Sequence, residues 1–270
     1  MQRKVAILLV LIVLLPVGLL TWLGLRMAHN EQQMAAAQVQ ALVQTKLGQV
    51  DEQTNGYFRT LQDDWLARLQ KRSLDYDALK NLPPELGIVQ QVLVIGADGK
   101  RVFPVAGASL SEADKQFIQR TAAIWDNPSL LSQGAALVAQ PVANSKSFVS
   151  KGLNAPSAAA DAGPPKSGWY TWHWNAQVHH IFWWRDPQNR LVGLELAPVA
   201  LVSDIIGLLP NTREADATQA NTNTRLSNGN GQTVYEWGLY RPPEGAKPLA
   251  MRPLSHPLGT WKLEYFAPAL

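Results

Sequence analysis

The chain has 270 residues, no cysteine and a formal net charge of +3, from 24 basic and 21 acidic residues. Without cysteine, disulfide bonds are excluded, so the fold must depend on a buried apolar core. The basic residues are scattered along the chain, and a nucleic-acid partner is therefore not indicated.

Residues 5–25, from Val5 to Leu25, form a run of 21 residues without a charged side chain. At about 1.5 Å per residue, such a helix spans a hydrocarbon core of about 30 Å. A cleaved signal peptide would need a shorter apolar stretch, followed closely by a small-x-small site. The nearest Ala-x-Ala match after it, Ala35 to Ala37, lies well beyond the run. The sequence therefore predicts an uncleaved anchor over residues 1–27 that contacts the lipid bilayer.

The charges beside this run predict its orientation. Arg3 and Lys4 precede it, and the positive-inside rule keeps that end cytoplasmic. Residues 191–210 are also apolar, but Glu195 and Asp204 argue against a second span, because buried acids are costly in a membrane. We therefore expect a single-pass protein of the bacterial inner membrane, with its bulk in the periplasm.

Residues 28–82 are predicted to form a helical spine, helical over residues 28–71 and ended by Pro83-Pro84. Its apolar residues recur every eleven positions, which keeps the stripe almost straight along the helix. The stripe either packs on the chain's own domain or binds a protein partner, including a second copy. The three tracks are Val39, Val50 and Leu61; Leu47, Phe58 and Leu69; and Val43, Thr54 and Trp65.

Residues 83–210 alternate strand and helix signals. Strands are expected at 88–95 and 100–105 around the turn at 97–99, and a helix at 111–125 with Ser111 as N-cap and Asp114 in a capping-box position. A loop rich in Ala, Ser, Pro and Gly follows at 144–168. Three strands at 169–174, 178–185 and 190–196 then form a meander, closed by a helix at 199–209.

Residues 211–270 are predicted to form a second, smaller sheet unit. A polar linker at 211–224 leads to a hairpin turn at 228–231, and the last strand covers 261–266. The fold class is therefore α+β, with an N-terminal transmembrane helix, a helical spine and two antiparallel sheet units.

This order resembles the extracytoplasmic Cache or PAS-like input region of bacterial membrane-bound sensor histidine kinases. The resemblance is carried by LLPVGLLTWLGLRMAHNEQ at the membrane exit, the hairpins VLVIGADGKRVFP and WWRDPQNRLVGLEL, and PLGTWKLEYF near the end. It implies signal perception and transmission across the membrane in a two-component system. No phosphoacceptor box or nucleotide-binding motif is present, so we expect no kinase or other enzyme activity in this polypeptide.

An aromatic segment is the best candidate for ligand binding. Residues 169–185 hold five of the ten tryptophans and three of the five histidines. Because side chains alternate along a strand, one face of the first strand carries Tyr170, Trp172 and Trp174. On the next strand, His180 and Trp184 share a face. If the two faces meet one cavity, they form an aromatic box with Arg185 at its rim, suited to a small organic or carboxylate-bearing ligand. Otherwise these residues are cross-strand core pairs.

No metal or cofactor is expected. His179 and His180 are adjacent in a strand and should point to opposite faces, so they cannot readily share one ion. The sequence thus favours a sensory or ligand-binding module. The alternative is an envelope structural or assembly protein that binds its partner through the long helix.

Overall fold

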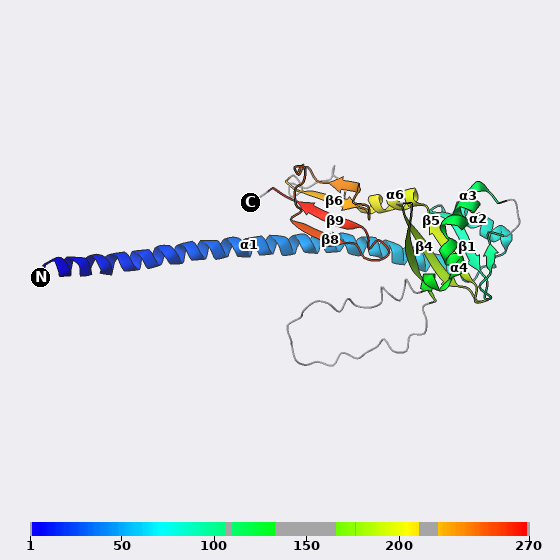
Figure 1. The fold of residues 1–270 in the computed structure, drawn as a ribbon, viewed down its shortest axis with the longest axis horizontal. Helices are drawn as coiled ribbons and strands as arrows, with labels where there is room; N and C mark the ends of the chain where they lie inside the picture. The colour runs from blue at the N-terminus through cyan, green and yellow to red at the C-terminus, as the bar shows by residue number, and fades with distance from the viewer. Residues whose placement is uncertain (1, 106–109, 133–165, 176, 211–220, 269–270) are drawn as a thin grey trace, which may run out of the picture.

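One long helix carries two antiparallel sheets, with the first sheet at its C-terminal end and the second alongside the part of the helix just before that end (Figure 1). This computed structural model describes residues 2–105, 110–132, 166–175, 177–210 and 221–268. Within residues 2–36, only the side chains of Trp22 and Met34 are described. The chain is α+β, as its sequence predicts.

Helix α1 (Gln2–Leu69) runs 68 residues without a break, so the predicted anchor and spine are continuous in the backbone. In the described part of the chain, no helix combines the length and apolarity needed to cross a membrane. Apart from Trp22, the side chains of residues 5–25 lie outside that part.

The predicted end of the spine at Pro83-Pro84 is wrong, because both prolines lie inside a second helix, α2 (Tyr76–Leu86). Asp75 caps this helix by accepting a hydrogen bond from Ala78 N at 2.9 Å. Each proline removes a backbone donor, but its carbonyl remains an acceptor, and the Pro83 carbonyl accepts from Gly87 N. Burial of Leu79 and Leu82 then stabilises the short helix against the first sheet.

The first sheet has the strand order β2-β1-β5-β4-β3, and every neighbouring pair is antiparallel. Its strands and the helices between them lie near their predicted positions. They are β1 (Val89–Ile95), β2 (Arg101–Phe103), α3 (Glu112–Arg120), α4 (Ala122–Asp126), β3 (Ser167–Trp174), β4 (Gln177–Arg185), β5 (Leu191–Leu196) and α6 (Pro198–Leu208).

Two boundaries in this unit differ from the prediction. The helix expected over 111–125 is divided at Thr121, whose hydroxyl donates to Phe117 O at 2.6 Å. Its start is confirmed, since Ser111 and Asp114 form a reciprocal capping box. Of the expected loop at 144–168, residues 144–165 lie outside the described residues, while Ser167 and Gly168 belong to β3, where they pair with β4.

The second sheet has the order β7-β6-β9-β8 and is also antiparallel. Its strands are β6 (Asn223–Ser227), β7 (Thr233–Trp237), β8 (Ala250–Pro253) and β9 (Lys262–Phe266). The expected linker extended too far, because β6 begins at Asn223; residues 211–220 lie outside the described residues. Strand β8 was not predicted, since its four residues are too few to show an alternating pattern.

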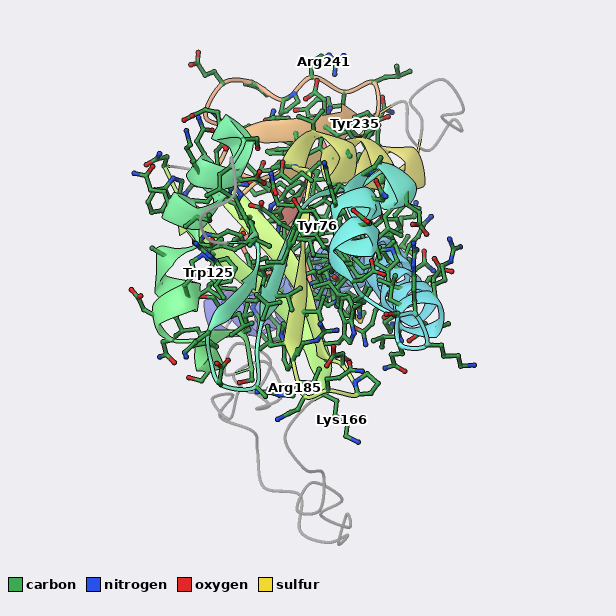
Figure 2. All side chains as sticks on the ribbon, turned by 90° about the vertical axis from the view of Figure 1, so that its right-hand side faces the viewer. Tyr76, Trp125, Lys166, Arg185, Tyr235 and Arg241 are labelled. Atoms are coloured by element: carbon green, nitrogen blue, oxygen red, sulfur yellow. The ribbon has the colours of Figure 1, made fainter. Side chains whose placement is uncertain are left out.

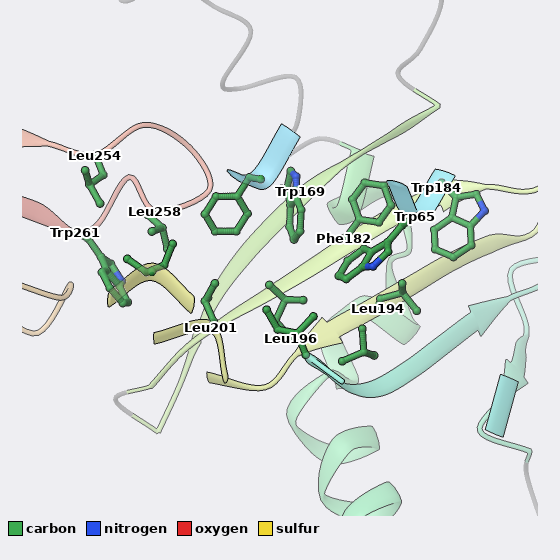
Figure 3. Close-up of a cluster of buried hydrophobic side chains, with 14 of the residues drawn as sticks. Trp65, Trp169, Phe182, Trp184, Leu194, Leu196, Leu201, Leu254, Leu258 and Trp261 are labelled. Carbon is green, nitrogen blue, oxygen red and sulfur yellow. The ribbon is translucent and has the colours of Figure 1, made fainter. Parts of the chain in front are cut away.

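The apolar stripe of α1 packs on both sheets of its own chain (Figure 3). From Val43 onward its main residues are almost fully buried, in one core that also contains Phe182 of the first sheet and Leu263 of the second. Trp65 lies 5.7 Å from Phe182 and 6.1 Å from Trp169, measured between ring centroids. The stripe is therefore internal along most of its length. Val39, at its start, remains exposed.

A polar contact fixes the second unit to the same helix. Asp51 of α1, which is buried, accepts hydrogen bonds from Ser255 N at 2.6 Å and from Ser255 Oγ at 3.0 Å. Arg252 pairs with the same carboxylate at 3.2 Å. The segment after β8 is thereby held on the spine.

Candidate functional site

The two faces of the first sheet have different surroundings. One face packs on α1, and the other is covered by α3 and α4. The cross-strand pairs Tyr170–Ile181 and Trp172–His179 place these side chains on the α3–α4 face, together with Trp183. We refer to this surface as the α3–α4 face.

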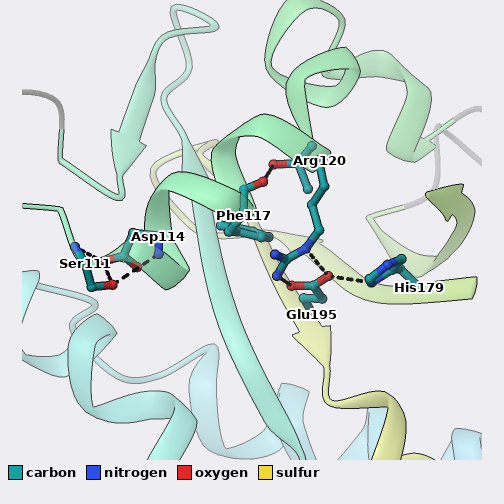
Figure 4. Close-up of polar contacts among 7 residues, drawn as sticks. Ser111, Asp114, Phe117, Arg120, His179 and Glu195 are labelled. Carbon is teal, nitrogen blue, oxygen red and sulfur yellow. Dashed lines mark hydrogen bonds and ion pairs between the residues drawn. The ribbon is translucent and has the colours of Figure 1, made fainter. Parts of the chain in front are cut away.

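A buried polar cluster lies at the centre of this face (Figure 4). Glu195 of β5 is fully buried, and its Oε1 accepts from Arg120 Nε at 3.0 Å and from His179 Nδ1 at 3.0 Å. Arg120 Nη2 donates to the other carboxylate oxygen, so the guanidinium binds in a bidentate manner. The cluster thus joins α3, β4 and β5.

Local structure explains why Arg120 reaches this carboxylate. It is the last residue of α3, because Thr121 interrupts the helix immediately after it. The Arg120 guanidinium also lies 5.1 Å from the Phe117 ring, over which its charge is favourably placed. Phe117 itself is fully buried, so the end of α3 is fixed over the sheet.

The electrostatics keep Glu195 ionised. Burial raises the pKa of its carboxyl, but the hydrogen bonds from His179 and Arg120 and the charge of Arg120 outweigh it, and the net shift is downward. The His179 ring donates from Nδ1 to this carboxylate, which leaves Nε2 as an acceptor when the ring is neutral. The carboxylate therefore orients the imidazole.

Within the part of the chain that the structure describes, several buried nitrogen atoms on this face have no hydrogen-bond partner: His179 Nε2 and the indole Nε1 atoms of Trp125, Trp172 and Trp183. Buried polar groups in proteins are normally bonded. Unpaired indole nitrogens also occur at Trp184 and Trp261 in the core beside α1. The distinctive feature of the α3–α4 face is the unpaired imidazole acceptor, positioned by a buried ion pair.

Aromatic stacking places the two predicted residues Tyr170 and Trp172 beside this cluster. The Trp172 ring stacks on His179 with centroids 4.9 Å apart, and Tyr170 stacks on Trp172 at 6.1 Å. When the His179 ring is neutral, Trp172 Nε1 and His179 Nε2 are a donor and an acceptor on adjacent stacked rings. This pair can bind a group that both accepts and donates hydrogen bonds.

The predicted aromatic box is divided by the sheet. Trp174 pairs with Gln177 and shares the face of Trp172, whereas His180 and Trp184 lie on the opposite face, toward α1. Arg185 is exposed at the end of β4, close to Lys166 (Figure 2). The condition that both faces meet one cavity is therefore not fulfilled. The register decides this, because Trp172 pairs with His179 and not with His180.

His180 instead connects the two sheets. Its Nδ1 lies 3.1 Å from Thr171 Oγ1, and that hydroxyl donates to Pro257 O at 3.1 Å. Burial lowers the pKa of His180 to about 3, helped by the neighbouring His256, His179 and His173. A neutral imidazole is therefore part of the contact between β3 and the loop before β9.

The sequence predicted Tyr170 and Trp172 as site residues. It did not predict Arg120, Glu195 or the hydrogen bonding of His179. Glu195 is the only charged residue in the strand Leu191–Leu196, and this signal could have marked it. No comparable signal exists for Arg120, whose partner is 75 residues away. In the described ranges, no three His, Asp or Glu side chains are grouped to hold a metal ion. The expectation that His179 and His180 point to opposite faces is confirmed.

No family model, no curated protein and no solved structure matches this chain.

Proposed function

We propose that the chain is a membrane-anchored, extracytoplasmic sensory module of a two-component-type signalling system, and that its α3–α4 face binds a small organic ligand. The single observation that carries the ligand site is the buried, unpaired Nε2 of His179 beside the unpaired Nε1 of Trp172. A ligand group placed between them would satisfy both atoms and remove a desolvation cost.

The resemblance to Cache or PAS-like input regions supports the wider proposal. A long N-terminal helix that carries two small antiparallel sheets is the architecture which that resemblance implies. In PAS-like folds, a face of the sheet lines the ligand cavity. The proposed anchor, residues 5–25, belongs to the same continuous helix on which both sheets pack, so a change in that packing would act directly on the membrane segment.

A ligand screen with two matched variants tests this function. We would measure melting of the full-length protein in a nonionic detergent against a library of small organic compounds. A specific ligand raises Tm, and the increase grows with the logarithm of its concentration once that exceeds Kd. Trp172→Phe removes the indole donor on the α3–α4 face, while Trp184→Phe removes an indole on the opposite face whose Nε1 is likewise buried.

We expect a ligand that stabilises the wild type and Trp184→Phe alike and stabilises Trp172→Phe much less. If no compound raises Tm, or if the two variants respond equally, the proposed ligand face is refuted.

The alternative role as an envelope assembly factor also has a specific observation in its favour. Met34, Val39 and Leu42 are exposed by 60, 40 and 59% on the part of α1 that precedes the sheets. Because the chain has no cysteine, Met34→Cys introduces a single thiol. Oxidative cross-linking of membranes containing this variant to a second copy or another envelope protein would favour the alternative.

A further inference from the structure

A cavity of about 270 Å³ lies between α1 and the second sheet, far along the chain from the α3–α4 face. Its size is close to the lower end for small-molecule sites, roughly 300 Å³. Its walls come from one side of α1 and from the inner side of the second sheet. The lining residues are Lys46, Leu47, Gln49, Val50, Gln53, Pro210, Thr222, Thr224, Trp237 and Tyr265.

Every polar side chain among the described lining residues can donate a hydrogen bond, and none of them is a carboxylate. Within the described residues, the side chains of Lys46, Gln49 and Gln53 have no hydrogen-bond or ion-pair partner. The nearest acids of α1 are occupied, since Asp51 pairs with Arg252 and Glu52 pairs with Arg59. Among the residues that the structure describes, the cavity therefore holds one exposed ammonium group and no carboxylate.

The arrangement of the walls separates a charged side from an apolar one. Lys46, Val50 and Gln53 follow one another at helical spacings of four and three, so they share one face of α1. Opposite them, Thr224 is paired with Trp237 on one side and Tyr265 on the other. A ligand would meet one ammonium group, several amide and hydroxyl groups, and the apolar surfaces of Val50 and Trp237.

We propose that this cavity binds a small organic monocarboxylate, with its carboxylate at Lys46 and its apolar part against Val50 and Trp237. One ammonium group balances one negative charge. A phosphate dianion favours bidentate guanidinium groups, and none of the described lining residues is an arginine. The volume limits the ligand to about the size of an aromatic acid with one ring.

A ligand in this position would contact α1 and three strands of the second sheet at once. It would thus stabilise the packing of that sheet on the spine, at a place independent of the α3–α4 face. The inference does not depend on the proposed function, and either can fail without the other.

NMR of the indole NH groups in full-length protein, in a nonionic detergent, tests the site directly. The Trp237 signal is assigned by Trp237→Phe, and the probes are propionate and benzoate with their uncharged amides. We expect the Trp237 signal to shift with at least one carboxylate and not with the matched amide. Lys46→Gln should weaken that carboxylate roughly tenfold, the loss expected for one charge-assisted bond.

Two control variants keep the result specific. Lys247→Gln removes an exposed charge outside the cavity, and Trp172→Phe alters the α3–α4 face; both should bind the carboxylate as the wild type does. The inference is overturned if neither carboxylate moves the Trp237 signal, if the amides bind equally well, or if Lys46→Gln binds with unchanged affinity.

Discussion

Glu195 is completely buried and yet charged. Partners that are distant in sequence stabilise this buried charge. Its carboxylate is bound by Arg120 from α3 and by His179 from β4. A buried ion pair adds little net stability, because desolvation offsets much of the attraction. Removing one partner is different, because it leaves an uncompensated charge in the core.

Arg120→Ala should therefore destabilise the protein strongly. We expect a loss of about 3 kcal/mol or more in the free energy of unfolding, measured by urea denaturation. Arg68→Ala is the matched control, because Arg68 pairs with Asp64 on the exposed side of α1. That pair should contribute less than about 1 kcal/mol. Equal losses in the two variants would contradict the buried role of Arg120.

We expect His180 to make the free energy of unfolding decrease in acid. Its pKa is about 3 in the folded protein and about 6.5 when exposed, so the folded state binds fewer protons between these values. Stability should thus be highest above about pH 6.5 and fall as the pH decreases toward 3. By pH 4.5 the loss from this residue is on the order of 2 kcal/mol.

The slope of unfolding free energy against pH measures this effect. His180→Phe should flatten the slope between pH 6.5 and 4.5, although His256, whose pKa burial also lowers, retains part of it. His173→Gln alters an exposed ring that contributes least to the lowered pKa of His180, so it should change the slope far less than His180→Phe does. An unchanged slope in His180→Phe would show that this imidazole does not remain neutral in the fold.

At the scale of elements, two glycines show how differently a strand and a helix tolerate a side chain. A Cβ on Gly193 of β5 would lie 2.8 Å from Leu93 Cγ and 3.1 Å from Ile181 Cγ2. A Cβ on Gly56 of α1 would meet no atom within 4 Å. The centre of the first sheet is therefore fully packed, while this position of the spine is open.

Alanine substitutions should consequently have opposite signs. Gly193→Ala should destabilise the protein by roughly 1–3 kcal/mol through overpacking. Gly56→Ala should stabilise it by roughly 0.5–1 kcal/mol, because alanine restricts the unfolded chain and favours the helix. Thermal and urea unfolding of both variants measure the difference. A stabilising Gly193→Ala would mean that β1, β4 and β5 are less tightly packed than the structure indicates.

At the scale of the whole molecule, α1 makes the two sheets parts of one core. Phe182 of the first sheet and Leu263 of the second belong to the same buried cluster, and Asp51 holds the loop after β8 on the helix. Helix α6 lies between the sheets, and its Leu201 and Ile205 join that cluster. The two units thus have separate sheets, but their buried side chains pack in one core.

This continuity predicts one cooperative unfolding transition. In protein labelled with fluorotryptophan, the signals of Trp183 in the first sheet and Trp237 in the second should change at the same urea concentration. Asp51→Ala should lower that midpoint for both signals, because it removes three contacts to Arg252 and Ser255. Two separated midpoints in the wild type would contradict a shared core.

Structural features that depend on neighbouring residues along the chain could be predicted from the sequence. The α1 stripe, the Ser111 capping box, the turn at 97–99 and most strands were readable from periodicity and turn residues, which act over a few positions. Short or interrupted elements could not be read in this way. Examples are β8, the break at Thr121 and the prolines of α2. In each of these, packing overrides the local signal.

The candidate sites depend on tertiary contacts that the local sequence does not reveal. Tyr170 and Trp172 were found from composition, but strand register separated them from His180 and Trp184 and joined them to His179. Arg120 reached Glu195 across 75 residues, and Lys46 came to face Trp237 across nearly two hundred. Local patterns specify which face of an element is apolar, whereas the contacts that position polar groups depend on how distant elements pack together.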